Sequence, residues 1–261
     1  MGKVLAIANQ KGGVGKTTTS VNLAASLTVT RKKVLLIDLD PQGNATMGSG
    51  INKSELELSV YDLLTEQANI HEVLQSAADS DYDLLPANGD LVAAEVSLLE
   101  AENRETRLRE IVQSVRDQYD FIVIDCPPSL NMLTINALVA ADGVVIPMQC
   151  EYYALEGLSA LMDTIRVIQD RINPDLKIEG ILRTMYDPRN KLTSEVNGQL
   201  FNYFGDAVYR TVVPRNVRLA EAPSFGKPVI KYDRQSRGAI AYLALAGELL
   251  RRSEQATARV G

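Results

Sequence analysis

A glycine-rich segment directly after the first apolar run constrains the fold of this chain more than any other feature. The run is the strand candidate Val4–Ala8, and a helical pattern begins at Lys16. Between them lies NQKGGVG, and Thr17 and Thr18 come directly after Lys16. Glycines allow a tight turn whose backbone N–H groups point inward and form an anion cradle at a helix N-terminus. The residues expected around the phosphates of a nucleotide are Lys11, Gly12, Gly13, Val14, Gly15, Lys16, Thr17 and Thr18.

Two lysines and a hydroxyl in this loop predict its chemistry. Lys16 is placed to reach the β- and γ-phosphates, and the Thr17 hydroxyl to ligate Mg²⁺ directly,. The dinucleotide pattern GxGxxG fails, because Thr18 stands where the third glycine belongs,. The ordinary phosphate-loop pattern also fails at its first position, where Gln10 replaces glycine, and Lys11 is an extra lysine inside the loop.

Short β-branched runs alternate with longer helical patterns along the rest of the chain. The expected strands are Val4–Ala8, Val34–Asp38, Tyr82–Pro86, Phe121–Asp125, Val144–Met148, Ile178–Met185, Tyr209–Val213 and Pro228–Lys231. The expected helices are Lys16–Thr28, Ser59–Glu66, Leu91–Glu100, Glu105–Gln118, Leu133–Ala141, Leu155–Ile172, Ser194–Phe204 and Gly238–Arg252. This alternation predicts an α/β, doubly wound, mainly parallel sheet of about eight strands with helices on both faces. We expect one domain over 1–252 and a short polar tail over 253–261.

The composition is that of a globular protein and leaves a nucleic-acid partner open. The chain has 261 residues, of which 46% are hydrophobic and 23% charged, and its net charge is −6. An acidic balance argues against nucleic-acid binding. However, the segment Arg183–Arg237 holds ten Lys/Arg and five Asp/Glu, which leaves −11 for the remainder. A basic face and a solvated, salt-bridged surface are both compatible with this distribution.

The remaining composition points to the cytoplasm. Cys126 and Cys150 lie in or beside apolar runs without a CxxC partner, as buried thiols of a reducing compartment do,. The single histidine, His71, lies in a polar stretch and offers no metal cluster. No apolar run approaches the roughly 18 residues of a membrane span, and the first is too short for a signal peptide,. We therefore expect a soluble cytoplasmic protein that does not bind membranes.

Five segments resemble one family of ATPases. The loop KGGVGKT resembles the deviant Walker A motif shared by ParA, MinD and the nitrogenase iron protein. The other four segments, which resemble ParA/Soj chromosome- or plasmid-partitioning ATPases, are VLLIDLDPQGNAT, FIVIDCPPSL, VIPMQCEYYALEGL and VPRNVRLAEAPSFGKPV. The resemblance covers nearly the whole chain. It implies a P-loop fold, ATP and Mg²⁺ as cofactors, ATP hydrolysis and an ATP-bound sandwich homodimer. It also implies non-specific DNA binding on the nucleoid and stimulation by a ParB-like centromere-binding protein.

The resemblance also implies roles for the charged residues of the site. Lys11 would cross the dimer interface to the partner's phosphates, and Asp40 would orient the attacking water,. Asp125 matches the Walker B carboxylate that holds a magnesium-bound water, while Asp38 would support Mg²⁺ through water or support the strand end. Both Asp38 and Asp125 end buried strands, where the ligand crevice of a parallel sheet lies.

Nucleotide and DNA contacts are further implications of the family. Pro214 and Asn216 would lie near the adenine with Met185, and Glu151 would reach the sugar across the dimer. Two arginines, Arg189 and Arg218, align with arginines that the family uses on DNA. The alternative for these arginines is a structural pairing, with Asp187 for Arg189 and with Glu221 for Arg218.

Three other functions were weighed against partitioning. A MinD-like membrane-cycling ATPase requires a C-terminal amphipathic helix, whereas Ala239–Ala246 is apolar almost all round, as in a helix packed into the core,. An iron–sulfur protein requires cysteines in that family's motifs, where Cys126 and Cys150 do not fall,. A nucleotide binder without hydrolysis would not need the set Lys11, Asp40 and Asp125.

Overall fold

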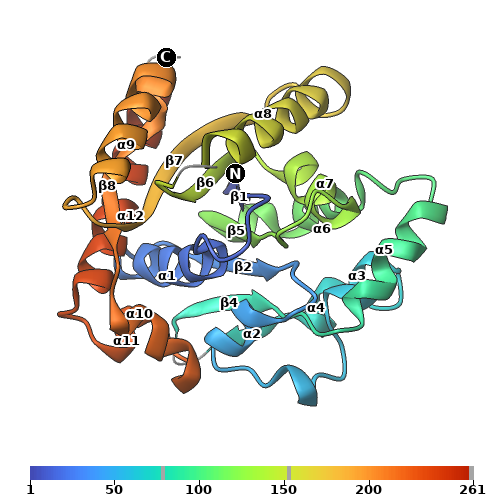
Figure 1. The fold of residues 1–261 in the computed structure, drawn as a ribbon. Coiled ribbons are helices and arrows are strands. Elements are labelled where there is room, and N and C mark those ends of the chain that lie inside the picture. The colour runs from blue at the N-terminus through green and yellow to red at the C-terminus, as the bar shows by residue number, and fades with distance from the viewer. Residues whose placement is uncertain (78–79, 152–153, 259–261) are drawn as a thin grey trace.

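The computed structural model describes residues 1–77, 80–151 and 154–258. One eight-stranded sheet forms the centre of the fold (Figure 1). The strands are β1 (Lys3–Ile7), β2 (Val34–Asp38), β3 (Gln75–Ala77), β4 (Tyr82–Leu85), β5 (Phe121–Asp125), β6 (Gly143–Gln149), β7 (Lys177–Tyr186) and β8 (Val208–Pro214). Their order is β3-β4-β2-β5-β1-β6-β7-β8. Every pair is parallel except β3–β4, which is antiparallel at one edge.

Helices cover both faces of the sheet, because successive side chains of the central strands point to opposite faces. In β1, Val4 and Ala6 belong to one buried cluster, while Leu5 and Ile7 belong to the other. The first face is covered by α3 (Val60–Leu64), α4 (Ile70–Val73), α5 (Leu91–Glu100), α6 (Arg107–Val115), α7 (Met132–Ala140), α8 (Ala154–Arg171) and α9 (Lys191–Phe204). The second face is covered by α1 (Lys16–Val29), α2 (Asn44–Gly48), α10 (Val217–Glu221), α11 (Val229–Tyr232) and α12 (Arg237–Ala258). Short 3₁₀ segments are η1 (Lys53–Glu55), η2 (Arg116–Gln118), η3 (Gly205–Ala207) and η4 (Ala222–Phe225).

The predicted fold class is confirmed, but one predicted strand is wrong. Residues Pro228–Lys231 contribute no strand, and α11 begins at Val229 instead. Val229 and Ile230 are consecutive and both buried, which a half-buried strand does not allow,. The Val229 N–H also donates to the Asn22 side chain (2.7 Å), so α1 holds this segment. The sequence analysis missed β3, because Gln75–Ala77 contains no β-branched or aromatic residue,.

The C-terminal helix packs as the sequence predicts but is longer. It continues to Ala258 rather than ending at Arg252, and the last three residues of the expected tail lie outside the described residues. On one side of the helix, Tyr242, Leu245 and Leu249 are buried against the second face of the sheet, whereas Ile240 on another side is exposed. Up to Leu249 the helix thus has one face in the core, as predicted for Ala239–Ala246 against the MinD-like alternative. Within the described ranges, no helix has the length and apolar character needed to cross a membrane.

Three parallel strands end together and thereby create the site. Ile7 of β1 pairs with Asp125 of β5, and Asp38 of β2 pairs with the same Asp125. The phosphate loop follows β1 directly and leads into α1. Two carboxylates and one glycine-rich loop therefore meet at the carboxyl edge of the sheet, where ligands of such sheets bind.

Candidate nucleotide site

The loop from Asn9 to Lys16 has the backbone of an anion cradle. Gly13 and Gly15 have φ values of 73° and 87°, in the left-handed region that favours glycine, and Gly15 is the N-cap of α1,. Lys16 is buried, and its Nζ donates to the carbonyl oxygen of Lys11 at 3.2 Å. Burial lowers the pKa of the Lys16 ammonium, and nearby Asp125 opposes that shift. The Lys16 side chain is thus folded back over the cradle.

Side chains from neighbouring strands hold the loop from behind. The Thr184 hydroxyl at the end of β7 donates to the Val14 carbonyl at 2.7 Å. Asn9 donates to the Pro147 carbonyl of β6 at 2.8 Å and accepts from the Lys11 N–H at 3.0 Å. These bonds fix the cradle before any ligand binds, which reduces the ordering cost of binding.

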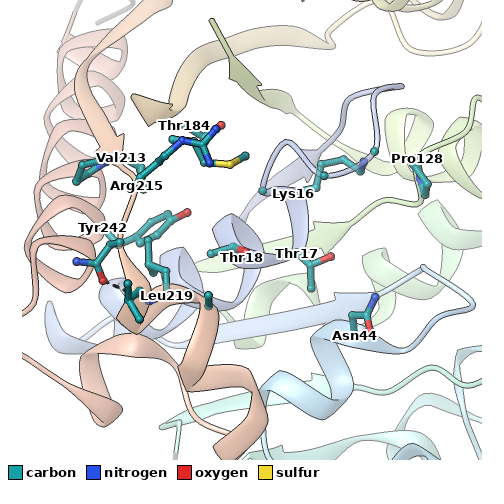
Figure 2. Close-up of a pocket in the computed structure, with 18 of the residues that line it drawn as sticks. Lys16, Thr17, Thr18, Asn44, Pro128, Thr184, Val213, Arg215, Leu219 and Tyr242 are labelled. Atoms are coloured by element: carbon teal, nitrogen blue, oxygen red, sulfur yellow. Dashed lines mark hydrogen bonds between the residues drawn. The ribbon is translucent and has the colours of Figure 1, made fainter. Parts of the chain in front are cut away.

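A cavity of about 750 Å³ opens in front of the cradle. Predicted residues lining it are Gly12, Gly13, Gly15, Lys16, Thr17, Thr18, Asp40, Met185, Pro214 and Asn216. Figure 2 shows Thr17 and Thr18 at the start of α1, with Arg215 and Tyr242 on one side and Pro128 and Asn44 on the other. Segments that are distant in sequence therefore form one pocket of the size that small-molecule ligands occupy.

Asp125 lies beside this pocket with one carboxylate oxygen unsatisfied. The side chain is fully buried, and its Oδ1 accepts from the Ser20 hydroxyl at 2.7 Å. Its Oδ2 has no hydrogen-bond partner among the described residues. Burial and the neighbouring Asp38 raise the pKa of Asp125, while the hydroxyls of Ser20 and Thr17 act in the opposite direction. A buried acceptor without a donor indicates a place for a ligand.

Asp38 is equally buried but saturated by its own loop. Its Oδ2 accepts from the N–H and the hydroxyl of Thr46, both at 2.8 Å, and its Oδ1 accepts from the Asp40 N–H at 3.1 Å. Burial raises the pKa of Asp38. Asp40 lines the cavity, and its Oδ1 accepts from the Gln42 N–H at 2.9 Å. Asp38 thus anchors the loop that presents Asp40, in keeping with the strand-end role; magnesium support by Asp38 stays a prediction.

The donor set fits a nucleotide with a hard divalent cation. Lys16 and the cradle N–H groups suit phosphate oxygens, and the Thr17 hydroxyl with Asp125 Oδ2 suits Mg²⁺. The described residues contain no group of three or more His, Cys, Asp or Glu that could hold a metal ion. Mg²⁺ does not require such a cage, because it commonly keeps waters and binds through one or two protein ligands and substrate phosphates.

Lys11 and Glu151 do not line this cavity. They pair with each other at 2.7 Å, and both side chains are partly exposed, at 40% and 44%. Both residues were predicted to reach across to a partner subunit, and that role stays a prediction. The pair is itself a contact that the sequence analysis did not foresee.

The two candidate DNA arginines are exposed and paired with nearby carboxylates. Arg189 makes two bonds to Asp187, at 2.9 and 2.8 Å, which lower the pKa of Asp187 to about 2. Arg218 pairs with Glu221 at 2.7 Å and with Asp233 at 3.3 Å. The pairings named as the alternative are therefore present. Ion pairs at this level of exposure stabilise a protein little and exchange readily for other anions.

Several residues that line the pocket were not identified from the sequence, and Thr184, Arg215 and Tyr242 are three of them. Thr184 and Arg215 follow or end strands at the carboxyl edge, and Tyr242 comes from α12, where its hydroxyl lies 3.1 Å from that of Thr19. The general position of ligand sites at strand ends could have indicated Thr184 and Arg215. Nothing in the local sequence indicates Tyr242, because α12 reads as a core helix.

Comparisons with known proteins agree with this geometry. A family model described as an AAA domain matches residues 2–178. The chain is 55% identical over 249 residues to the sporulation initiation inhibitor protein Soj of Bacillus subtilis (strain 168), covering 95% of this chain and 98% of the relative. It is 50% identical over 255 residues to the chromosome-partitioning ATPase Soj of Treponema pallidum (strain Nichols), covering 98% and 100%.

A solved structure shows the same fold. Cobyrinic acid a,c-diamide synthase from Mycobacterium smegmatis, with a bound ATP analog and magnesium, is 38% identical with a TM-score of 0.86, covering 97% of this chain and 96% of that one. The fold and the loop define a P-loop ATPase with a deviant Walker A motif. The chain belongs to the ParA/Soj family of chromosome-partitioning ATPases.

Proposed function

We propose that this chain hydrolyses ATP with Mg²⁺ and uses the ATP-bound state, as a sandwich dimer on non-specific DNA, to segregate DNA. One observation carries the nucleotide part: a single cavity joins the glycine cradle, Lys16 and Asp40, next to a buried carboxylate oxygen of Asp125 without a partner. The segregation part is supported by 50–55% identity to two Soj proteins over nearly the full chain.

The residues of the site divide the work of phosphoryl transfer. Lys16 would exchange the Lys11 carbonyl for phosphate oxygens, and the Thr17 hydroxyl with Asp125 would hold Mg²⁺, the latter through water,. Bound Mg²⁺ neutralises charge on the phosphates. Asp40 keeps its carboxylate at the cavity wall, where it would orient the attacking water,. Pro214, Asn216 and Met185 form the part of the wall expected to receive the base.

Lys11 would couple hydrolysis to dimerisation. Its ammonium lies outside the cavity of its own subunit and forms a partly exposed ion pair with Glu151. Such a pair contributes about 1 kcal/mol or less, so Lys11 can exchange Glu151 for phosphates of a second subunit at low cost. Glu151 is then released toward the partner's nucleotide sugar.

DNA binding would depend on the number of cations in the dimer. Arg189 and Arg218 each hold exposed ion pairs that phosphates can replace. Two subunits would double the number of such contacts, and affinity through phosphates rises steeply with that number. Such an increase would explain how an acidic chain binds DNA in its ATP state only. A ParB-like partner would stimulate hydrolysis and release the dimer from the nucleoid in the cytoplasm.

Charge reversal tests the DNA surface. We expect Arg189→Glu or Arg218→Glu to abolish gel shifts of random DNA with ATP and Mg²⁺, while light scattering still detects the dimer. Arg166→Glu on α8 is the matched control, since this exposed arginine also pairs with a nearby carboxylate, Asp163. Unchanged DNA affinity in both variants, or a loss that follows a lowered melting temperature, would contradict this surface.

Lys11→Ala tests the crossing role separately. We expect this variant to bind ATP and to remain monomeric in light scattering, because its proposed target lies on the second subunit. ATP-dependent dimerisation at the wild-type level would show that Lys11 has no such role.

A further inference from the structure

Helix α5 has apolar side chains on two sides, and only one side packs into the protein. Leu91, Ala94 and Leu98 are buried in the core cluster of the first face. Val92, Val96 and Leu99, which we call the α5 stripe, are 59%, 63% and 57% exposed. Their i, i+4, i+7 spacing places them along one line of the helix surface. Figure 1 places α5 at the periphery of the molecule, beside α3.

Carboxylates flank the α5 stripe. At 3.6 residues per turn, Glu95 lies along one side of the stripe and Glu100 along the other,. The segment from Asp90 to Glu105 contains five acidic residues and one basic residue, Arg104. Arg104 is already paired with Glu105 at 2.9 Å. The surface therefore combines an apolar line with negative margins.

Glu95, the carboxylate on one side of the α5 stripe, is connected to the nucleotide site. The Asn131 side-chain amide donates to Glu95, and Asn131 is also the N-cap of α7, accepting from the Thr134 N–H at 3.1 Å. Asn131 ends the short loop that starts at Asp125, and Pro128 of this loop lines the cavity. A ligand that draws Glu95 away from Asn131 would change the loop that carries the Walker B carboxylate.

We propose that the α5 stripe is the docking site for a basic amphipathic helix of a partner protein, which stimulates hydrolysis through Glu95 and Asn131. The charge of the surface selects this occupant, because lysines or arginines beside the partner's apolar face would pair with Glu95 and Glu100. A second copy would place the same carboxylates against each other, which is unfavourable. The stripe is also a line about 11 Å long on one helix face, which suits a single helical segment better than the roughly 800 Å² per partner of a stable dimer,. The stimulation part rests on the proposed function.

Peptide binding tests the surface without reference to catalysis. The probe is a labelled synthetic peptide with leucine on one helical face and lysine on the other, and fluorescence anisotropy measures its binding to the full chain. We expect Val96→Lys and Leu99→Lys each to weaken binding about tenfold or more, because a buried contact is replaced by a like charge. Val167→Lys on α8, at a 51% exposed valine, should leave binding unchanged. Glu95→Gln with Glu100→Gln should weaken binding and reduce its dependence on salt.

The outcomes separate the surface from the proposed function. No binding of the peptide to the wild-type chain, or equal binding to Val96→Lys, overturns the docking site. A wild-type dimer without ATP that Val96→Lys dissociates also overturns it, since the stripe would then be a self-contact. Stimulation of ATP turnover by a ParB-like protein is measured in parallel. If Val96→Lys loses this stimulation but retains basal turnover, the coupling through Glu95 and Asn131 is supported. Stimulation of Val96→Lys at the wild-type level contradicts the coupling. Absence of stimulation in the wild type contradicts the proposed function, whatever the peptide does.

Discussion

The loops after β2 and β5 begin with two paired aspartates that differ in their hydrogen bonds. Asp38 and Asp125 lie opposite each other in adjacent parallel strands, and both are fully buried. Asp38 accepts three hydrogen bonds from its own loop, whereas Asp125 Oδ1 accepts from Ser20 and Asp125 Oδ2 has no partner among the described residues. Equal position and equal burial therefore do not imply equal function.

From this difference we propose that Asp38 is a structural carboxylate and that Asp125 is a ligand-binding one. Asp38 satisfies donors that would otherwise be buried without acceptors, so its contribution is to the stability of the 38–46 loop. Asp125 keeps an acceptor oxygen that has no partner among the described residues, so we expect it to contribute to ligand binding and turnover,. Stability and activity measurements on matched variants can test this assignment of roles.

The largest expected effect is on stability. Asp38→Ala leaves the Asp40 N–H, the Thr46 N–H and the Thr46 hydroxyl without their acceptor. Each buried unsatisfied group costs about 1–3 kcal/mol, so we expect a loss of about 4 kcal/mol in urea unfolding. A loss below about 1 kcal/mol would show that Asp38 does not anchor the loop.

Asp125→Asn should act on turnover instead. The amide retains an oxygen for Ser20 but replaces the free carboxylate oxygen with a donor. We expect Mg²⁺-dependent ATP turnover to fall on the order of 100-fold, since groups that orient metal-bound water contribute about 10–100-fold. The free energy of unfolding should change by about 1 kcal/mol or less. Loss of stability with normal turnover would reverse the assignment of the two aspartates.

The smallest effect is expected at Thr46. Its hydroxyl donates to Asp38 at 2.8 Å and accepts from the Ala87 N–H at 2.9 Å, so it ties the β2 loop to the segment after β4. Thr46→Val removes both bonds, and we expect a loss of about 2 kcal/mol in the same unfolding assay. Thr46→Ser is the control that keeps the hydroxyl and should lose much less. A loss confined to Thr46→Ser, with Thr46→Val as stable as the wild type, would assign the stabilisation to the methyl group and contradict the role of the hydroxyl.

The sequence was sufficient for the fold and for the cradle, because both depend on local patterns. β1, the loop from Lys11 and the helix from Lys16 follow one another without interruption, and each contains its own signal. The segment Pro228–Lys231 was misread because a short apolar stretch such as Val229 and Ile230 fits a strand or a buried helix turn equally well. Its contact with Asn22 decides the outcome,.

The different states of Asp38 and Asp125 could not be predicted from their own strands. Both read as an aspartate at the end of an apolar run. The donors that distinguish them come from elsewhere: Thr46 reaches Asp38 from the end of a folded loop, and Ser20 reaches Asp125 from α1. The pairing of Lys11 with Glu151, 140 positions apart, likewise depends on the closed sheet.

Calorimetric titration of ATP with Mg²⁺ into the wild-type chain and into Lys16→Ala tests the nucleotide site most directly. Lys16 is the buried cation of the cradle, held at 3.2 Å from the Lys11 carbonyl in a position to receive phosphates. The account predicts saturable binding by the wild type and no detectable binding by the variant, because a charge-assisted contact to phosphate is lost. Normal ATP affinity in Lys16→Ala, with the melting temperature unchanged, would contradict the assignment of this loop and cavity as the nucleotide site.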